Sequence, residues 1–249
     1  MKLLKTLLAA ACAAMLIAGC KSGNYATEER ADKGLVVILP GIEGPSIYNE
    51  SIRKGLYEGG VPFELEIYDW HPHEAGLWYL FNEPAARRRA AEAAAHVADY
   101  MQAHPGEPVF IVGHSAGAGI AVFAAEVLGP SRRIDGIVLM GASLSPTYDL
   151  TKALEVSNYR MVSCSGSTDL FIWWMSVAAH NIDGTKGRAA GQEGFRLPKD
   201  ATPERREAFL HLEQIRWSPT MITKGNLGGH TGWASSHWVA ANIAPIISR

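Results

Sequence analysis

Residues 106–129 read GEPVFIVGHSAGAGIAVFAAEVLG, and this stretch decides the fold. Residues 108–113 are apolar and rich in valine and isoleucine, which predicts a buried strand. Residues 116–129 are small and apolar, which predicts a helix that ends at Gly129. The motif GHSAG, residues 113–117, joins the two. The glycines on both sides of Ser115 permit a sharp turn, which would lift the serine hydroxyl clear of the strand.

The same alternation of strand and helix continues on both sides. Apolar runs predict further strands at 34–41, 61–70, 133–143, 159–166 and 218–225, and helices are expected at 82–104 and 235–248. The 82–104 helix is the clearest, with Asn82 as its N-cap and Pro84 in its first turn. This order predicts an α/β domain with a mainly parallel central sheet and helices on both faces.

One interval departs from the pattern. Residues 170–217 begin with aromatic residues, continue through glycine- and charge-rich sequence, and end in a helix-like stretch at 204–217. No strand is evident there. We therefore expect an insertion over one face of the sheet, as a lid or pocket wall.

Composition narrows the function classes. The chain has 249 residues, of which 47% are hydrophobic, and its net charge is −2. One domain of this size can bury a full core. The mild acidity gives no reason to expect nucleic-acid binding, and no basic tract marks a surface that would bind a membrane.

The first residues, MKLLKTLLAAACAAMLIAGC, differ from the rest of the chain. Two early lysines, an apolar stretch and small residues predict a signal peptide over 1–19. Residues 16–20, LIAGC, resemble a bacterial lipobox, which implies lipidation of Cys20, a polar tether over 20–33 and attachment to a membrane of the cell envelope. By resemblance to enterobacterial lipoproteins, Lys21 favours the outer membrane. The domain itself is then expected over 34–249.

Cysteine usage fits this division. Loss of Cys12 with the signal and lipidation of Cys20 would leave Cys164 alone, so no internal disulfide is expected. Cys164 lies in the apolar run YRMVSCSG and is predicted to be a buried strand residue.

The motif IVGHSAG resembles the nucleophile elbow of the α/β-hydrolase superfamily, and the resemblance extends from about residue 34 to the C-terminus. It implies that Ser115 is a nucleophile. Asp169, just past the 159–166 strand, matches the usual position of the acid, with Asp149 as its rival. His230, which follows two glycines in a predicted loop, matches the base, and His237 in the predicted 235–248 helix is the alternative. The order Ser115, Asp169, His230 fits this fold.

The resemblance also implies an oxyanion hole. The loop LPGIEG, residues 39–44, carries Pro40 where the family often has histidine. We expect the backbone N–H groups of Ile42 and Ala116 to hold the oxyanion. Glu43 is expected to turn outward, because a carboxylate in the site would oppose a developing negative charge.

Aromatic residues cluster in the loops expected around the site. Trp78, Trp173, Trp174 and Trp233 are candidates for an apolar acyl pocket. His71 and His73 lie two residues apart beside acidic residues, but Pro72 and the lack of a third ligand argue against a metal. We expect no metal and no cofactor.

The sequence thus predicts a serine hydrolase of carboxylic esters that acts on a small-molecule or lipid-like acyl substrate. Thioesterase, amidase, peptidase or acyltransferase chemistry on the same three residues remains open, as does a non-catalytic lipoprotein with this fold.

Overall fold

The computed structural model describes residues 24–72, 74–169 and 179–248. The predicted signal peptide, Cys20 and Lys21 lie outside them. The described residues form one six-stranded sheet in the order β2-β1-β3-β4-β5-β6, and each neighbouring pair is parallel. The strands are β1 (Leu35–Leu39), β2 (Glu64–Ile67), β3 (Val109–His114), β4 (Ile134–Met140), β5 (Ser157–Ser165) and β6 (Leu212–Arg216).

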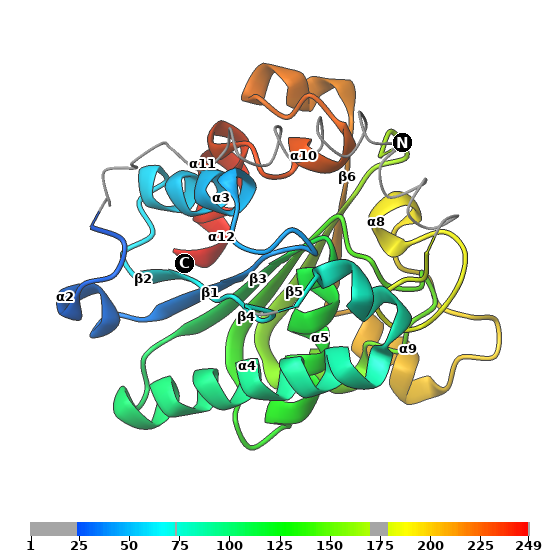
Figure 1. Cartoon of the computed structure of the whole chain (residues 1–249), viewed down its shortest axis with the longest axis horizontal. Coiled ribbons are helices and arrows are strands. Elements are labelled where there is room, and N and C mark those ends of the chain that lie inside the picture. Colours follow the sequence, from blue (N-terminus) through cyan, green and yellow to red (C-terminus); the bar gives the residue numbers. More distant parts are fainter. Residues whose placement is uncertain (1–23, 73, 170–178, 249) are drawn as a thin grey trace, which may run out of the picture.

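Helices cover both faces of this sheet (Figure 1). One face carries α4 (Glu83–Ala103), α5 (Ala116–Leu128) and α6 (Thr151–Val156), and the other carries α3 (Ile47–Glu58), α11 (Ser236–Asn242) and α12 (Ala244–Ile247). The shorter helices are α2 (Glu28–Ala31), α8 (Ala190–Glu193), α9 (Pro203–Phe209), α10 (Gly229–Gly232) and the 3-10 turns η1 (Gly76–Phe81) and η2 (Pro219–Lys224).

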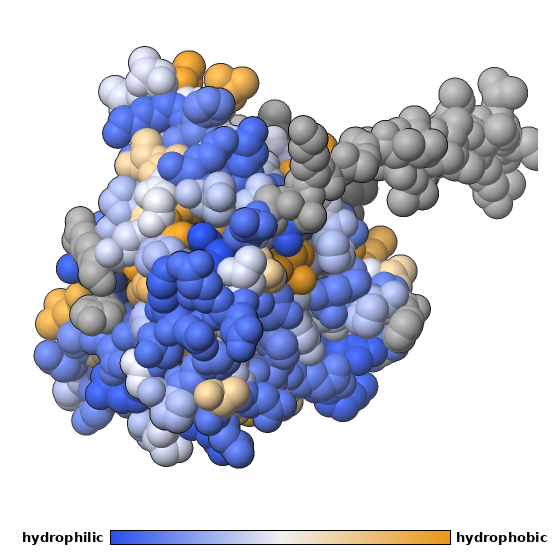
Figure 2. Space-filling view, turned by 90° about the vertical axis from the view of Figure 1, so that its left-hand side faces the viewer, coloured by the Kyte–Doolittle hydropathy of each residue, from blue (hydrophilic) through white to orange (hydrophobic). Residues whose placement is uncertain are grey.

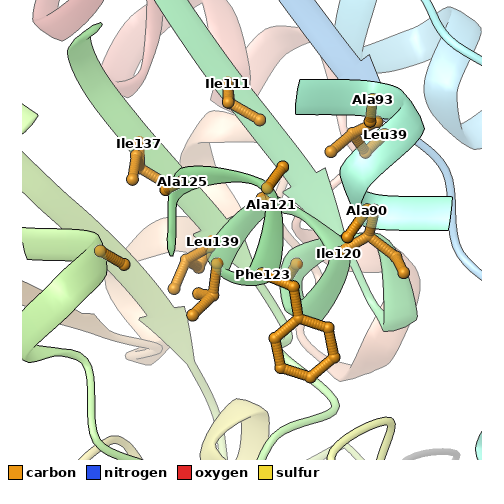
Figure 3. Packing of buried hydrophobic residues seen from close by; sticks show 14 of the residues in the cluster. Leu39, Ala90, Ala93, Ile111, Ile120, Ala121, Phe123, Ala125, Ile137 and Leu139 are labelled. Atoms are coloured by element: carbon orange, nitrogen blue, oxygen red, sulfur yellow. The ribbon is translucent and has the colours of Figure 1, made fainter. Parts of the chain in front are cut away.

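The core has two layers because side chains alternate along each buried strand. In β1, Leu35, Val37 and Leu39 pack toward α4 and α5, whereas Val36 and Ile38 pack toward α3 and α11. Figure 3 shows the first layer, where alanines of α4 and α5 allow the helices to approach the isoleucines and leucines of β1, β3 and β4. The two layers fix the strands, and so fix the positions of the loops at the strand ends.

Several predicted elements are confirmed and two are wrong. The helix expected at 82–104 is α4, and the Asn82 side chain accepts a hydrogen bond from the Ala85 N–H as its cap. The strand expected at 218–225 is instead the 3-10 turn η2. The last strand is β6, which lies in the stretch predicted to be helical. Residues 212–216 therefore belong to the sheet and not to an insertion. The sequence analysis also did not predict helix α3.

Residues 24–33, the described part of the predicted tether, contact the domain instead of extending away from it. The Tyr25 carbonyl accepts a hydrogen bond from the Leu65 N–H at 2.9 Å. Arg30 donates to the carbonyls of Val61 and Phe63, at 2.6 and 2.8 Å. These residues are therefore docked on the domain beside β2, because their polar side chains find backbone acceptors there.

Cys164 lies buried on β5, as predicted, and burial raises the pKa of its thiol. Among the described residues, no helix has the length and apolar character needed to cross a bilayer. On the face that Figure 2 shows, hydrophilic residues predominate and hydrophobic residues appear in small separate groups.

Candidate active site

Ser115 occupies a strained turn between β3 and α5. Its backbone has φ 58° and ψ −122°, a conformation that residues with a side chain rarely adopt and that costs about 1–3 kcal/mol. The turn is held from both sides, because the Ser115 N–H donates to the Met140 carbonyl at 2.9 Å and its carbonyl accepts from the Ser143 N–H at 3.2 Å. A side chain at Gly117 would collide with the carbonyls of Leu39 and Pro40. Only glycine lets α5 begin this close to the end of β1.

Asp169 and His230 meet at the carboxyl-terminal ends of the parallel strands, where Ser115 also lies. Asp169 follows β5 in a turn, in which its N–H donates to the Gly166 carbonyl at 3.1 Å. His230 is the second residue of α10, although the sequence predicted a loop there. The His230 Nδ1–H donates to Asp169 Oδ2 at 2.8 Å. The Asp169 carboxylate is fully buried, and the His230 side chain is 9% exposed. A buried carboxylate in this position fixes the orientation of the ring.

The loop that carries His230 is held by residues that the sequence analysis missed. The buried Asn226 side chain accepts a hydrogen bond from the Gly228 N–H at 3.0 Å. The Thr168 hydroxyl, next to Asp169, accepts one from the Gly229 N–H at 3.3 Å. The Thr168 side chain therefore joins the acid loop to the backbone of the base loop, beside the pair formed by Asp169 and His230.

His114 links the serine turn to His230. The ring centroids of His114 and His230 are 4.8 Å apart, and His114 Nε2 lies 3.2 Å from the His230 carbonyl oxygen, to which it donates. Burial lowers the pKa of the His230 imidazole, and although the bond to Asp169 acts in the opposite direction, the pKa stays below its ordinary value. The ring is therefore neutral at pH 7, as a general base must be.

The loop 40–44 lies against Ser115. A Cβ placed on Gly41 would lie 3.0 Å from the Ser115 Cβ and closer still to the Glu43 carboxylate. The expectation that Glu43 turns outward is therefore wrong. Its Oε1 lies 3.9 Å from His114 Nδ1 and accepts a hydrogen bond from the Ser46 hydroxyl at 3.4 Å. These partners draw the side chain inward.

The inward position leaves Glu43 ionised. Partial burial acts to raise the pKa of this carboxyl, but the contact with His114, a backbone hydrogen bond and the nearby His230 together hold the pKa below its ordinary value. The candidate site thus carries a carboxylate beside the serine, in addition to that of Asp169.

Comparisons with known proteins agree with this architecture. The family model described as "alpha/beta hydrolase fold" matches residues 71–163. Lipase B of Aspergillus fumigatus superposes with a TM-score of 0.53 at 10% identity, over 94% of this chain and 58% of the lipase. A protein from Thermus thermophilus superposes with a TM-score of 0.52 at 16% identity, over 87% of this chain and 90% of its own length. The chain has the α/β-hydrolase fold.

A further solved structure and a search of curated sequences were also compared with the chain. The thioesterase RedJ, from the prodiginine biosynthetic pathway in Streptomyces coelicolor, superposes with a TM-score of 0.49 at 15% identity, over 96% of this chain and 94% of RedJ. A search of curated protein sequences gave no match. At these identities the likeness to solved structures is one of fold.

The hydrolase fold separates the rival candidates. The Asp149 carboxylate accepts hydrogen bonds from Thr151 at the start of α6 and lies 3.4 Å from Arg205. His237 is exposed on α11. The structure therefore brings His230 together with Asp169 rather than with Asp149.

The four tryptophans predicted to line a substrate pocket differ in their exposure, and two of them are not described. Trp233 is 1% exposed and packs against Trp238 in the core, so the expectation that it lines a substrate pocket is wrong. Trp78 is 45% exposed on η1, in the loop that follows β2. Trp173 and Trp174 lie outside the described residues.

Of the two histidines weighed as metal ligands, the structure describes only His71. His71 is buried and its Nε2–H donates to the Gly41 carbonyl at 3.1 Å, while His73 lies outside the described residues. No group of three metal-ligating side chains occurs among the residues that the structure describes.

Proposed function

We propose that this protein is a serine hydrolase that cleaves carboxylic esters through Ser115, His230 and Asp169. The observation that carries the proposal is the buried 2.8 Å hydrogen bond between His230 and Asp169, at the sheet edge where Ser115 lies in a strained turn. Strain of this kind is concentrated at functional sites. A packed serine with no chemical role gives no reason for it.

The reaction follows from the arrangement. The Nδ1–H of His230 is bound to Asp169, so Nε2 is the nitrogen that takes the Ser115 proton as the serine oxygen attacks the acyl carbon. The carbonyl π electrons move to the oxygen, and the N–H groups of Ala116 and Ile42 bind the resulting oxyanion. When the intermediate collapses, His230 gives the proton to the leaving alcohol. Water then attacks the acyl-enzyme in the same way and releases the acid.

The substrate is proposed to be a small or lipid-like ester with an apolar acyl group. The exposed Trp78 on η1 supports this, because the loops at the carboxyl ends of parallel strands gather over the site. The inward carboxylate of Glu43 adds a condition, since it disfavours acyl groups that carry negative charge.

The proposal is tested with p-nitrophenyl esters of increasing chain length, alongside matched acyl thioesters and amides. Wild type is expected to release nitrophenol, and Ser115→Ala to lose the activity to background. Ser143→Ala is the matched control, because the hydrogen bond from Ser143 to the serine turn is donated by its backbone N–H, which alanine keeps. Equal rates in wild type and Ser115→Ala would refute the proposal. Faster thioester or amide cleavage would keep the nucleophile and change the bond.

We also propose that Cys20 carries a lipid and holds the protein on a membrane of the cell envelope. The support is the sequence LIAGC at the end of an apolar segment with early lysines. Acyl chains bind a bilayer through burial of hydrocarbon, at about 0.8 kcal/mol for each methylene.

A further inference from the structure

The motif DWHPHEAG, residues 69–76, has no part in the reaction as described, yet it contacts the loop beside Ser115. The Trp70 Nε1–H donates to the Pro40 carbonyl at 2.8 Å. The His71 Nε2–H donates to the Gly41 carbonyl at 3.1 Å. Two consecutive residues after β2 thus bind two consecutive carbonyls after β1.

Both donors are buried in a rigid setting. Trp70 is 1% exposed and His71 is 6% exposed. Their rings meet edge to face with centroids 4.2 Å apart, and Trp70 meets Tyr79 in the same manner at 5.0 Å. The Tyr79 hydroxyl accepts a hydrogen bond from Arg89 Nε at 2.9 Å. Ring pairs packed in this way hold the direction of each N–H.

The loop itself has little freedom left. The Gly41 carbonyl also accepts from the Gly44 N–H at 3.1 Å, which closes a tight turn over residues 41–44. A side chain at Gly76 would collide with the Ile42 backbone, so glycine lets η1 pack directly on the turn. The turn is therefore held by the hydrogen bond from His71 and by the close packing of Gly76 on Ile42.

Peptide geometry gives this contact a consequence. The Gly41–Ile42 peptide is trans, so its C=O and N–H groups point in opposite directions. When His71 holds the carbonyl, the Ile42 N–H must point away from His71. Without this bond the Gly41 carbonyl keeps its contact with the Gly44 N–H but loses the restraint from His71. The peptide plane is then held less firmly, and a rotation of half a turn would present a carbonyl oxygen where an oxyanion donor is needed.

We propose that Trp70 and His71 are positioning residues, which bind the Pro40 and Gly41 carbonyls so that the Ile42 N–H is preorganised for the oxyanion. The inference rests on the proposed serine hydrolysis. Preorganised donors act without reorganisation during the reaction, and loss of one typically reduces turnover about 10²–10³-fold. A donor that is present but poorly aligned loses part of this, so about 10–100-fold is expected for each disrupted bond.

The test compares variants that keep an aromatic ring at each position and remove the N–H. Trp70→Phe and His71→Phe are expected to lower kcat about 10–100-fold with KM within twofold, because the oxyanion exists only in the transition state. His71→Gln returns an N–H donor at similar reach and is expected to recover most of the loss. Tyr79→Phe is the matched control, since it removes a polar group from the same ring cluster and leaves both carbonyl bonds intact.

A second readout does not depend on turnover. Amide hydrogen exchange of the peptide that contains residues 39–44 is expected to be faster in His71→Phe than in Tyr79→Phe. Phenylalanine variants with wild-type kcat and unchanged exchange would overturn the positioning role while Ser115→Ala still abolished activity. An inactive wild type would instead refute the proposed function, and with it the catalytic meaning of these bonds.

Discussion

The inward carboxylate of Glu43 predicts a charge preference that can be measured. Glu43 Oε2 and Ser115 Cβ both lie within 3.0 Å of the point where a Gly41 side chain would begin. The Glu43 carboxylate oxygen therefore lies within about 5 Å of the Ser115 Cβ. We expect the charge on a flexible acyl group bound at Ser115 to approach the carboxylate to a similar distance. Two unit charges at that separation interact by about 1–3 kcal/mol for an effective dielectric constant between 80 and 20. Because the Glu43 side chain is 32% exposed, the lower end applies, about 1 kcal/mol.

The assay compares two p-nitrophenyl esters of equal length, the neutral valerate and the glutarate monoester, which ends in a carboxylate. Glu43→Gln is expected to raise the kcat/KM ratio of glutarate to valerate about fivefold, which corresponds to about 1 kcal/mol. Glu58→Gln, at the far end of α3, is the control, because its carboxylate pairs with Lys54 on the surface. The effect is expected to shrink in 1 M salt. A ratio that changes less than twofold, or changes equally in both variants, would refute this placement of the charge.

Three further predictions follow from the site and the N-terminus. Asp169→Asn is expected to reduce kcat about 10³–10⁴-fold with the fold intact, whereas Asp149→Asn stays within twofold, and steady-state kinetics separates the two. Burial keeps the pKa of His230 below its ordinary value of about 6.5. We therefore expect kcat/KM to stay level from pH 8 to about 6.5 and to fall at lower pH, because the ring then gains its proton. A fall in kcat/KM centred above pH 7 would contradict this. Cys20→Ala is expected to move the protein from the membrane fraction to the soluble fraction, and Cys12→Ala, which alters only the predicted signal, is not; equal fractionation would contradict the lipid anchor.

The sequence predicted the features that local patterns determine. The α4 helix follows from its alanine-rich body and the Asn82 cap, and β3 and α5 follow from the run around Ser115. Asp169 and His230 were candidates because their positions match those of the acid and base in the α/β-hydrolase superfamily, and the structure brings the two side chains together. The parallel sheet followed from the alternation of these elements.

The errors come from tertiary contacts. β6 is an edge strand whose residues are half exposed, so LEQIR looks like a continuation of the charged helix before it. Its pairing with β5 decides its conformation. Residues 219–224 contain β-branched side chains but have no strand beside them in the described sheet. Propensity alone does not distinguish these two cases.

Contacts between distant segments also determine features of the candidate site that the sequence did not predict. The Asn226 and Thr168 contacts with the His230 loop join segments about sixty residues apart or lie within one irregular turn, and neither leaves a pattern in the sequence. The inward turn of Glu43 depends on His114, seventy residues away. Contacts of this kind appear only once the chain is folded.

Labelling with a fluorophosphonate, followed by intact mass measurement and peptide mapping, tests directly whether Ser115 is the nucleophile. One adduct per chain is expected, on the peptide that contains Ser115. It is expected to be absent in Ser115→Ala and to form far more slowly in Asp169→Asn. A wild-type chain that takes up no probe, or an adduct that persists in Ser115→Ala, would contradict the claim that Ser115 is the nucleophile of this hydrolase fold.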